Sequence, residues 1–101
     1  MDTRIVRREE RKVCERGLKL WGVKAQLDKA TQEAAELAAA ICKYDERRDV
    51  QSKRDLVNEM ADCSVMIDVL KIILSFTDEE FQIVRADKYR AVIERLAVEG
   101  V

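Results

Sequence analysis

The sequence predicts an all-α fold, a four- to five-helix bundle that is completed by oligomerisation. The 101 residues include no proline and only three glycines, so nothing interrupts the backbone hydrogen-bond ladder of the long segments. The most hydrophobic segment, from Lys53 to Ser75, is apolar around most of its circumference, which predicts burial on more than one side. A chain of this length forms one domain, residues 1–101, and we expect further copies to cover part of that helix.

The first half of the chain is expected to form two helices. A first helix is expected from about Ile5 to Leu20; its early part is only weakly amphipathic, which is compatible with a peripheral position for residues 1–20. A second helix is expected from Lys24 to Lys43, after the Trp21-Gly22 pair. It carries leucine, isoleucine and alanine at helical spacing, and the alanines permit close packing against another helix.

The second half is expected to form a polar connection and two further helices. The segment from Tyr44 to Lys53 has no sustained apolar period and is expected to be the connection. Ser52 is the predicted N-cap of the helix that follows, with Asp55 three residues later. A capping box is also predicted at Thr77-Asp78-Glu79-Glu80, which begins a last helix that ends near residue 98.

The charge of the chain limits the classes of partner. The net charge is −1 although 39% of the residues are charged, so opposite signs are interspersed along the chain. No global positive field exists to hold a nucleic-acid backbone, and nucleic-acid binding is not expected. The longest apolar run, Val65 to Phe76, is too short to span a membrane and contains Asp68 and Lys71, which are expected to pair with each other or across a subunit interface.

The cysteines and the N-terminal segment indicate a cytoplasmic protein. An odd number of cysteines without C-x-x-C spacing argues against a disulfide framework and against a zinc site, so we expect reduced thiols. The first residues are charged and lack an apolar core, so a signal peptide is not expected. No histidine is present to activate a cysteine nucleophile, and Cys63 is expected to be an inert thiol. The cysteines are Cys14, Cys42 and Cys63.

Two acidic pairs with the same spacing are the main functional signal. Glu33 and Glu36 lie in one predicted helix, and Glu59 and Asp62 lie in the next. Residues three apart on a helix differ by about 60° of rotation, so each pair projects from one face. Two such helices packed together would bring four carboxylates into one apolar interface.

Carboxylates in such an interface require protons, basic partners or metal cations. A single E-x-x-E pair would be read as a solvated helix face, but two pairs on consecutive apolar helices favour metal. An oxygen-only set of ligands suits Mg²⁺ or Mn²⁺, whereas helical di-iron sites require a histidine, which the chain lacks. We therefore expect a divalent cation, with Mg²⁺ as the first choice.

The motif also carries a family resemblance. The sequence Gln26-x-x-Lys29-x-x-Gln32-Glu33-Ala34-Ala35-Glu36, followed by Glu59-Met60-Ala61-Asp62, resembles the all-α nucleoside triphosphate pyrophosphohydrolases of the MazG-like superfamily. Their signature is E-E-x-x-E followed by E-x-x-D, and Gln32 occupies the first acidic position here. The resemblance implies Mg²⁺-dependent cleavage between the α- and β-phosphates, giving a nucleoside monophosphate and pyrophosphate. It also implies that the four acidic residues form the metal and catalytic set.

Four further residues are candidates for contacts with the nucleotide. Lys29 lies one turn before Glu33, so it can meet a phosphate or form an ion pair with that glutamate. Trp21 can stack on a base or serve only in packing. Arg85 and Lys88 resemble a basic late-helix segment with which relatives contact phosphates, and their alternative is a solvated basic face.

The expected function is therefore a nucleotide pyrophosphohydrolase that forms a homodimer or homotetramer. The alternative is a catalytically weak or inactive helical module of the same fold, with an oligomerisation or regulatory role. The residue at position 32 keeps this alternative open, because a glutamine there removes one carboxylate from the signature.

Overall fold

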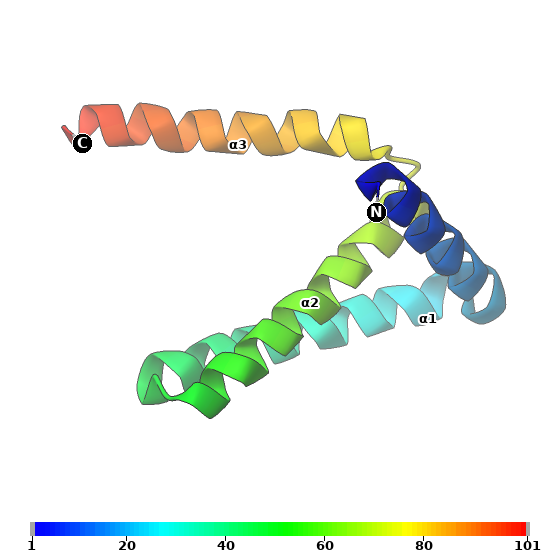
Figure 1. The fold of residues 1–101 in the computed structure, drawn as a ribbon, viewed down its shortest axis with the longest axis horizontal. Helices are drawn as coiled ribbons and strands as arrows, with labels where there is room; N and C mark the ends of the chain where they lie inside the picture. The colour runs from blue at the N-terminus through cyan, green and yellow to red at the C-terminus, as the bar shows by residue number, and fades with distance from the viewer. Residues whose placement is uncertain (1, 101) are drawn as a thin grey trace.

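The computed structural model describes residues 2–100 and is all-helical, as the sequence predicts. Three helices follow one another: α1 (Thr3–Arg47), α2 (Val50–Ile73) and α3 (Asp78–Val98). The second part of α1 lies beside α2, while α3 leaves the far end of α2 in a different direction (Figure 1). None of the helices between residues 2 and 100 has the length and apolar character needed to cross a membrane.

Helix α1 bends sharply at Gly22, where the sequence predicts a boundary between two helices. Gly22 has φ 87° and ψ 165°, a backbone conformation that is essentially restricted to glycine. The expected boundary is therefore a kink with no intervening loop. It directs residues 3–21 toward the end of α2, as the blue arm in Figure 1 shows.

The connection between α1 and α2 is much shorter than the predicted one. Arg48 adopts a left-handed conformation with φ 54°, and its N–H donates to the carbonyl of Tyr44 at 2.8 Å, which ends α1. Asp49 is the N-cap of α2, and its carboxylate accepts from the Ser52 N–H at 2.8 Å. The predicted N-cap at Ser52 is therefore wrong. Ser52 instead returns the second hydrogen bond of the capping box, because the helix begins a turn earlier.

The connection between α2 and α3 contains the capping box that the sequence predicts. The Glu80 N–H donates to the Thr77 hydroxyl at 3.0 Å, and the Thr77 N–H donates to the Glu80 carboxylate at 3.1 Å. Three acidic residues in the first turn complement the positive end of the helix dipole. The start of α3 is thus determined by local sequence.

The buried core of the chain is small and lies between α1 and α2. Cys14, Met66 and Val69 are buried, and Ala30, Ile72 and Ile73 pack against them. Of the described residues in α3, none is buried. A single chain therefore forms a helical hairpin with a folded-back N-terminal arm and a projecting third helix.

Candidate metal centre

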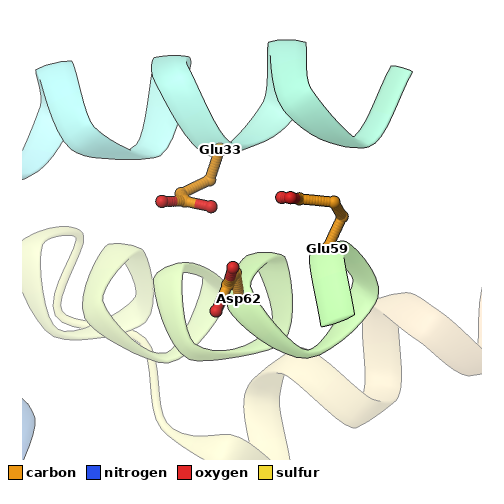
Figure 2. A group of neighbouring side chains, drawn as sticks. All are labelled: Glu33, Glu59 and Asp62. Atoms are coloured by element: carbon orange, nitrogen blue, oxygen red, sulfur yellow. The ribbon is translucent and has the colours of Figure 1, made fainter. Parts of the chain in front are cut away.

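Three carboxylates meet between α1 and α2. Glu33 projects from α1, and Glu59 and Asp62 project toward it from successive turns of α2 (Figure 2). One oxygen from each residue lies within 4.8 Å of the corresponding atoms of the other two. The antiparallel packing of α1 on α2 thus brings together residues that are separated by a connection and nearly thirty positions in sequence.

Two oxygens of this group are buried without hydrogen bonds. Glu33 is only 5% exposed, whereas Glu59 is half-buried and Asp62 is exposed. Within residues 2–100, Oε2 of Glu33 and Oε2 of Glu59 accept no hydrogen bond and are almost inaccessible to solvent. Buried polar atoms are nearly always hydrogen-bonded, and an unpaired carboxylate oxygen is costly. A bound cation or a shared proton would satisfy both oxygens at once.

Lys29 partly balances the negative charge. Its Nζ lies 2.9 Å from Oε1 of Glu33, so Lys29 forms the ion pair that its spacing from Glu33 allows. The hydrogen bond from Lys29 to Glu33 raises the pKa of the lysine. The Lys29 side chain is half exposed at the edge of the group. One ammonium group cannot neutralise three carboxylates, and it leaves Oε2 of Glu33 unpaired.

Glu59 has the electrostatic signature of a crowded acidic site. Loss of hydration raises its pKa above the ordinary value of 4.5, and the negative charges of Glu36, Asp62 and Glu33 raise it further. Ionised Glu59 is therefore destabilised in the folded chain. Protonation relieves this repulsion, and a bound cation would relieve it while keeping the carboxylate ionised.

Glu36, the fourth predicted ligand, lies just outside the three-carboxylate group. Its Oε1 accepts a hydrogen bond from Nε2 of Gln32 at 3.1 Å, one turn earlier on α1. It is still close enough to Glu59 to contribute to the raised pKa of that residue. Gln32, which stands where the resembling family has an acid, therefore orients Glu36 with an amide donor.

The donors fit a hard divalent cation. All three residues supply carboxylate oxygens, the ligand type that Mg²⁺, Mn²⁺ and Ca²⁺ prefer. Around an octahedral Mg²⁺ ion with bond lengths of about 2.1 Å, neighbouring oxygens are about 3.0 Å apart and opposite oxygens about 4.2 Å apart. The three carboxylate oxygens lie within 4.8 Å of one another, so side-chain rotations that bring them closer together would let them share such an ion. Asp62 is exposed, which leaves a side of the group open to solvent and to a ligand.

Cys63 lies beside the carboxylates and Gln26 is buried farther along α1, and neither was proposed as a site residue. The Cys63 thiol donates to the main-chain carbonyl of Glu33 at 3.2 Å, which links α2 to α1 beside the site. Burial and then the surrounding carboxylates raise the pKa of this thiol, which is free and stays protonated, as expected. Gln26 is buried two turns before Glu33 on α1. Gln26 and Glu33 are seven positions apart, a spacing that places both on the same face of a helix, and this spacing could have pointed to Gln26 in the sequence.

The other predicted nucleotide contacts are not gathered at the carboxylates in a single chain. Trp21 is exposed beside the kink and packs over Gly17. Arg85 and Lys88 lie on exposed turns of α3, and the Arg85 guanidinium lies over the ring of Tyr89. Among the described residues, neither forms an ion pair with an acidic residue of the site.

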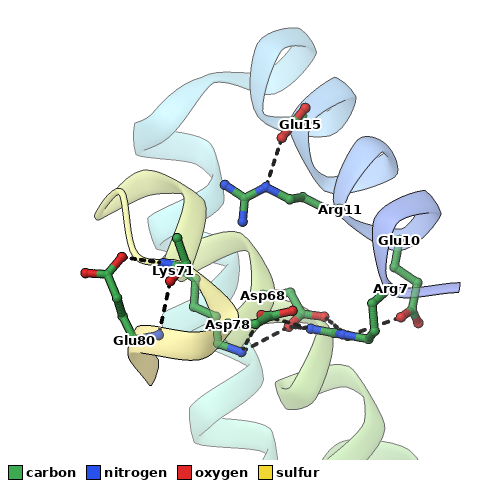
Figure 3. A network of polar contacts seen from close by, with 9 residues as sticks. Arg7, Glu10, Arg11, Glu15, Asp68, Lys71, Asp78 and Glu80 are labelled. Atoms are coloured by element: carbon green, nitrogen blue, oxygen red, sulfur yellow. Dashed lines mark hydrogen bonds and ion pairs between the residues drawn. The ribbon is translucent and has the colours of Figure 1, made fainter. Parts of the chain in front are cut away.

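A second polar cluster joins the three helices at the C-terminal end of α2. The Arg7 guanidinium donates to both oxygens of Asp68, at 2.7 and 2.9 Å (Figure 3). Lys71 lies 3.6 Å from Asp68, so their predicted pairing is confirmed, and 3.3 Å from Asp78 at the start of α3. The Lys71 ammonium also lies 4.3 Å from the centre of the Phe81 ring. This cluster, which we call the junction network, contains Arg7, Asp68, Lys71 and Asp78.

No protein-family model, curated protein or solved structure matches this chain. The resemblance described above therefore rests on the spacing of the acidic residues and on their positions in two helices.

Proposed function

We propose that the protein is a Mg²⁺-dependent nucleoside triphosphate pyrophosphohydrolase, with Mn²⁺ as an alternative ion. The observation that carries this proposal is the pair of buried, unpaired oxygens on Glu33 and Glu59, which lie in one group with Asp62. A structural helix pair gains nothing from this arrangement, because apolar residues of similar size would avoid the desolvation cost. The nucleotide substrate follows from the resemblance of the two acidic motifs to that enzyme family.

The chain supplies the groups that this reaction needs. Glu33, Glu59 and Asp62 would hold the cation. When bound, the ion would neutralise phosphate oxygens and lower the pKa of an attacking water. Lys29 is half exposed at the edge of the group, where its ammonium, which pairs with Glu33, can also meet a phosphate. Glu36, outside the group of three and held by Gln32, is the carboxylate left to accept a proton from the water.

The alternative function is a helical oligomerisation or regulatory module with weak or no catalysis. Gln32 in the acidic motif and the distance of α3 from the hairpin favour this alternative. It predicts a folded protein that binds the cation without hydrolysing nucleotides. The two functions therefore differ in turnover and agree in cation binding.

The decisive experiment is pyrophosphate release from a panel of ribo- and deoxynucleoside triphosphates, including modified bases. The panel is run with Mg²⁺, with Mn²⁺ and with excess EDTA. We expect metal-dependent release that falls at least a hundredfold in Glu59→Gln. Glu46→Gln, which changes an exposed glutamate near the end of α1, is the matched control and should keep full activity. Folded, metal-bound protein that releases no pyrophosphate from any substrate would favour the non-catalytic module.

A further inference from the structure

The positive charge of the chain is concentrated in the N-terminal arm, residues 3–21 of α1. This arm contains seven basic and three acidic residues and has a net charge of +4, whereas the whole chain has a net charge of −1. The rest of the chain is therefore acidic. The folded arm gives one end of the molecule a local positive potential that attracts small anions.

Four arginines lie on one face of the arm. Arg4, Arg8 and Arg11 follow one another at i, i+4 and i+7, and Arg7 lies beside them. These positions fall within about 100° of one another around the helix and extend over about 10.5 Å of its length. We call this surface the arginine face.

The arginine face forms one wall of a cleft of about 570 Å³. The other wall is the beginning of α3, where Asp78 and Glu79 line the cleft. The first turns of α1 and α3 both border this space, so the positive ends of two helix dipoles open toward it. Figure 1 shows the start of the arm beside the connection between α2 and α3. The volume is in the range of sites that bind small molecules.

Three of the four arginines keep hydrogen-bond donors for a ligand. Within residues 2–100, Arg8 forms no ion pair. Arg11 donates through Nε to Glu15 at 3.1 Å, and no partner within residues 2–100 accepts from its two Nη groups. Arg4 lies 3.5 Å from Asp2, a weak and exposed contact. Unpaired guanidinium groups that share one face repel one another, and a bound anion would relieve this repulsion.

Most of the acidic groups in the cleft already have other partners. The Asp78 carboxylate lies 3.4 Å from Arg7 and 3.3 Å from Lys71, in the junction network (Figure 3). The carboxylate of Asp2 caps the start of α1. Glu79 is exposed and forms no ion pair within residues 2–100, so it is the acidic group that would oppose an anion in the cleft.

The spacing of the arginines favours a ligand with several phosphate groups. A guanidinium group matches a phosphate with two parallel N–H···O hydrogen bonds, and arginine is the residue best suited to this contact. A single phosphate reaches only one or two of the groups. A chain of two or three phosphates would extend along the arginine face and fill more of the cleft.

We propose that the cleft between the arginine face and the start of α3 binds a small polyphosphate, either free or as the phosphate tail of a nucleotide. Of the described residues that line this cleft, none belongs to the candidate metal centre. Binding needs no divalent cation, because the guanidinium groups supply the positive charge. The bound ligand bridges Arg8 and Arg11 to the first turn of α3 and ties the arm to that helix.

The test is isothermal titration calorimetry of the full chain with inorganic tripolyphosphate, at low ionic strength and with excess EDTA. EDTA keeps the metal centre free of cations, and its three carboxylates then repel phosphate. We expect one tripolyphosphate per chain, with weaker binding of orthophosphate. A nucleoside triphosphate that binds as tightly would identify a nucleotide tail as the ligand. A nucleoside triphosphate that binds much more weakly would identify free polyphosphate.

Single substitutions assign the binding to the cleft. Arg8→Gln removes one charged contact and should weaken tripolyphosphate binding about tenfold, and Arg11→Gln should do the same. Arg16→Gln is the matched control, because this exposed arginine lies on the same arm, about 12 Å beyond Arg8, and does not line the cleft. It should leave the affinity almost unchanged. Glu79→Gln removes the opposing charge and should tighten binding.

Four results would overturn the proposal. They are an absence of tripolyphosphate binding in EDTA, binding that neither Arg8→Gln nor Arg11→Gln weakens, equal weakening by Arg16→Gln, and equally tight binding of citrate. Equal weakening by the control would indicate diffuse attraction to the whole arm, and equal binding of citrate would show that phosphate is not recognised. Circular dichroism should show unchanged helix content in every variant. No measurement involves metal or hydrolysis, so this cleft and the proposed enzymatic activity succeed or fail separately.

Discussion

Glu33 on α1 and Glu59 on α2 each bury one carboxylate oxygen that accepts no hydrogen bond within residues 2–100. Both residues contribute to the same group with Asp62, and Lys29 pairs only with the other oxygen of Glu33. The site is therefore a place where the folded chain carries an electrostatic cost. Such a cost is relieved by protons, by a cation or by removal of charge, and these three routes give separable predictions.

Divalent cations should raise the thermal stability of the protein. A cation that binds only the folded chain adds about 2.7 kcal/mol when its concentration is a hundred times its dissociation constant. Differential scanning fluorimetry with Mg²⁺ or Mn²⁺, and again after EDTA, measures this gain. In Glu59→Gln we expect a more stable metal-free protein and almost no gain from metal. Equal gains in Glu59→Gln and in the exposed control Glu46→Gln would rule out the site.

The raised pKa of Glu59 should make the metal-free protein more stable relative to Glu59→Gln as the pH falls. A group whose pKa is raised on folding contributes stability that is fully present below its unfolded value, here 4.5, and is lost as the pH rises through the folded value. The stabilising effect of Glu59→Gln should therefore be largest near pH 7 and should disappear near pH 4.5. Urea denaturation with EDTA at several pH values measures it. A difference between the two proteins that stays constant from pH 4.5 to pH 7 would contradict the raised pKa.

The junction network should contribute to stability through Asp68. Asp68→Asn removes the charge that accepts two hydrogen bonds from Arg7. The ammonium of Lys71, which is 9% exposed, then keeps only its ion pair with Asp78. We expect a loss of about 2 kcal/mol, less than for a fully buried pair because Arg7 is partly exposed. Asp87→Asn breaks an exposed pair with Arg90 on α3 and should cost no more than about 0.5 kcal/mol. Urea denaturation of both variants measures the contrast, and equal losses would contradict it.

Through Asp78, the junction network should make the folded protein less stable at acidic pH. Burial raises the pKa of Asp78, but hydrogen bonds from Lys71 and Arg7 outweigh it and hold the pKa below its ordinary value of 3.8. Its contribution is present above pH 3.8 and is lost as the pH falls through the lower folded value. Asp78→Asn should therefore destabilise the protein at pH 5 and have less effect at pH 2. Thermal unfolding at both pH values tests this, and an effect that does not diminish in acid would exclude Asp78 as the cause.

The kink at Gly22 should not accept a side chain. A Cβ at this position would meet no atom within 4 Å, so the cost of Gly22→Ala is purely conformational. The backbone region is essentially restricted to glycine, and we expect a loss of about 1–3 kcal/mol. Gly100→Ala, at another positive φ but next to the chain end, is the control and should cost much less. Unchanged stability and an unchanged radius of gyration in small-angle scattering of Gly22→Ala would show that the kink tolerates other residues.

Local signals in the sequence predicted much of the secondary structure. The absence of proline, the helical spacing of apolar residues and the Thr77–Glu80 capping box led to helices that the structure contains. Ser52 was misassigned because Asp49 offers an equally good cap one turn earlier, and Asp49 and Ser52 satisfy each other there. This capping box joins residues only three positions apart, so the local sequence contained the signal that the prediction overlooked.

The site was predicted in part. The spacing of Glu33, Glu59 and Asp62 on two helices indicated that they would share an interface, and the structure brings these three together. It places Glu36 outside the group and leaves Arg85 on the projecting helix α3. Helical periodicity identifies the face on which a residue lies. It does not specify how far the opposing helix is rotated or shifted.

The sequence by itself determined that this chain is helical, that two acidic pairs lie inside apolar helices, and where α3 begins. These features depend on residues a few positions apart, which interact through one helix. Only the tertiary structure decided that α1 bends at Gly22, that Oε2 of Glu33 and of Glu59 are buried without partners, and that the junction network directs α3 away from the hairpin. These features arise from contacts between helices, whose energies depend on burial and orientation and are absent until the helices pack.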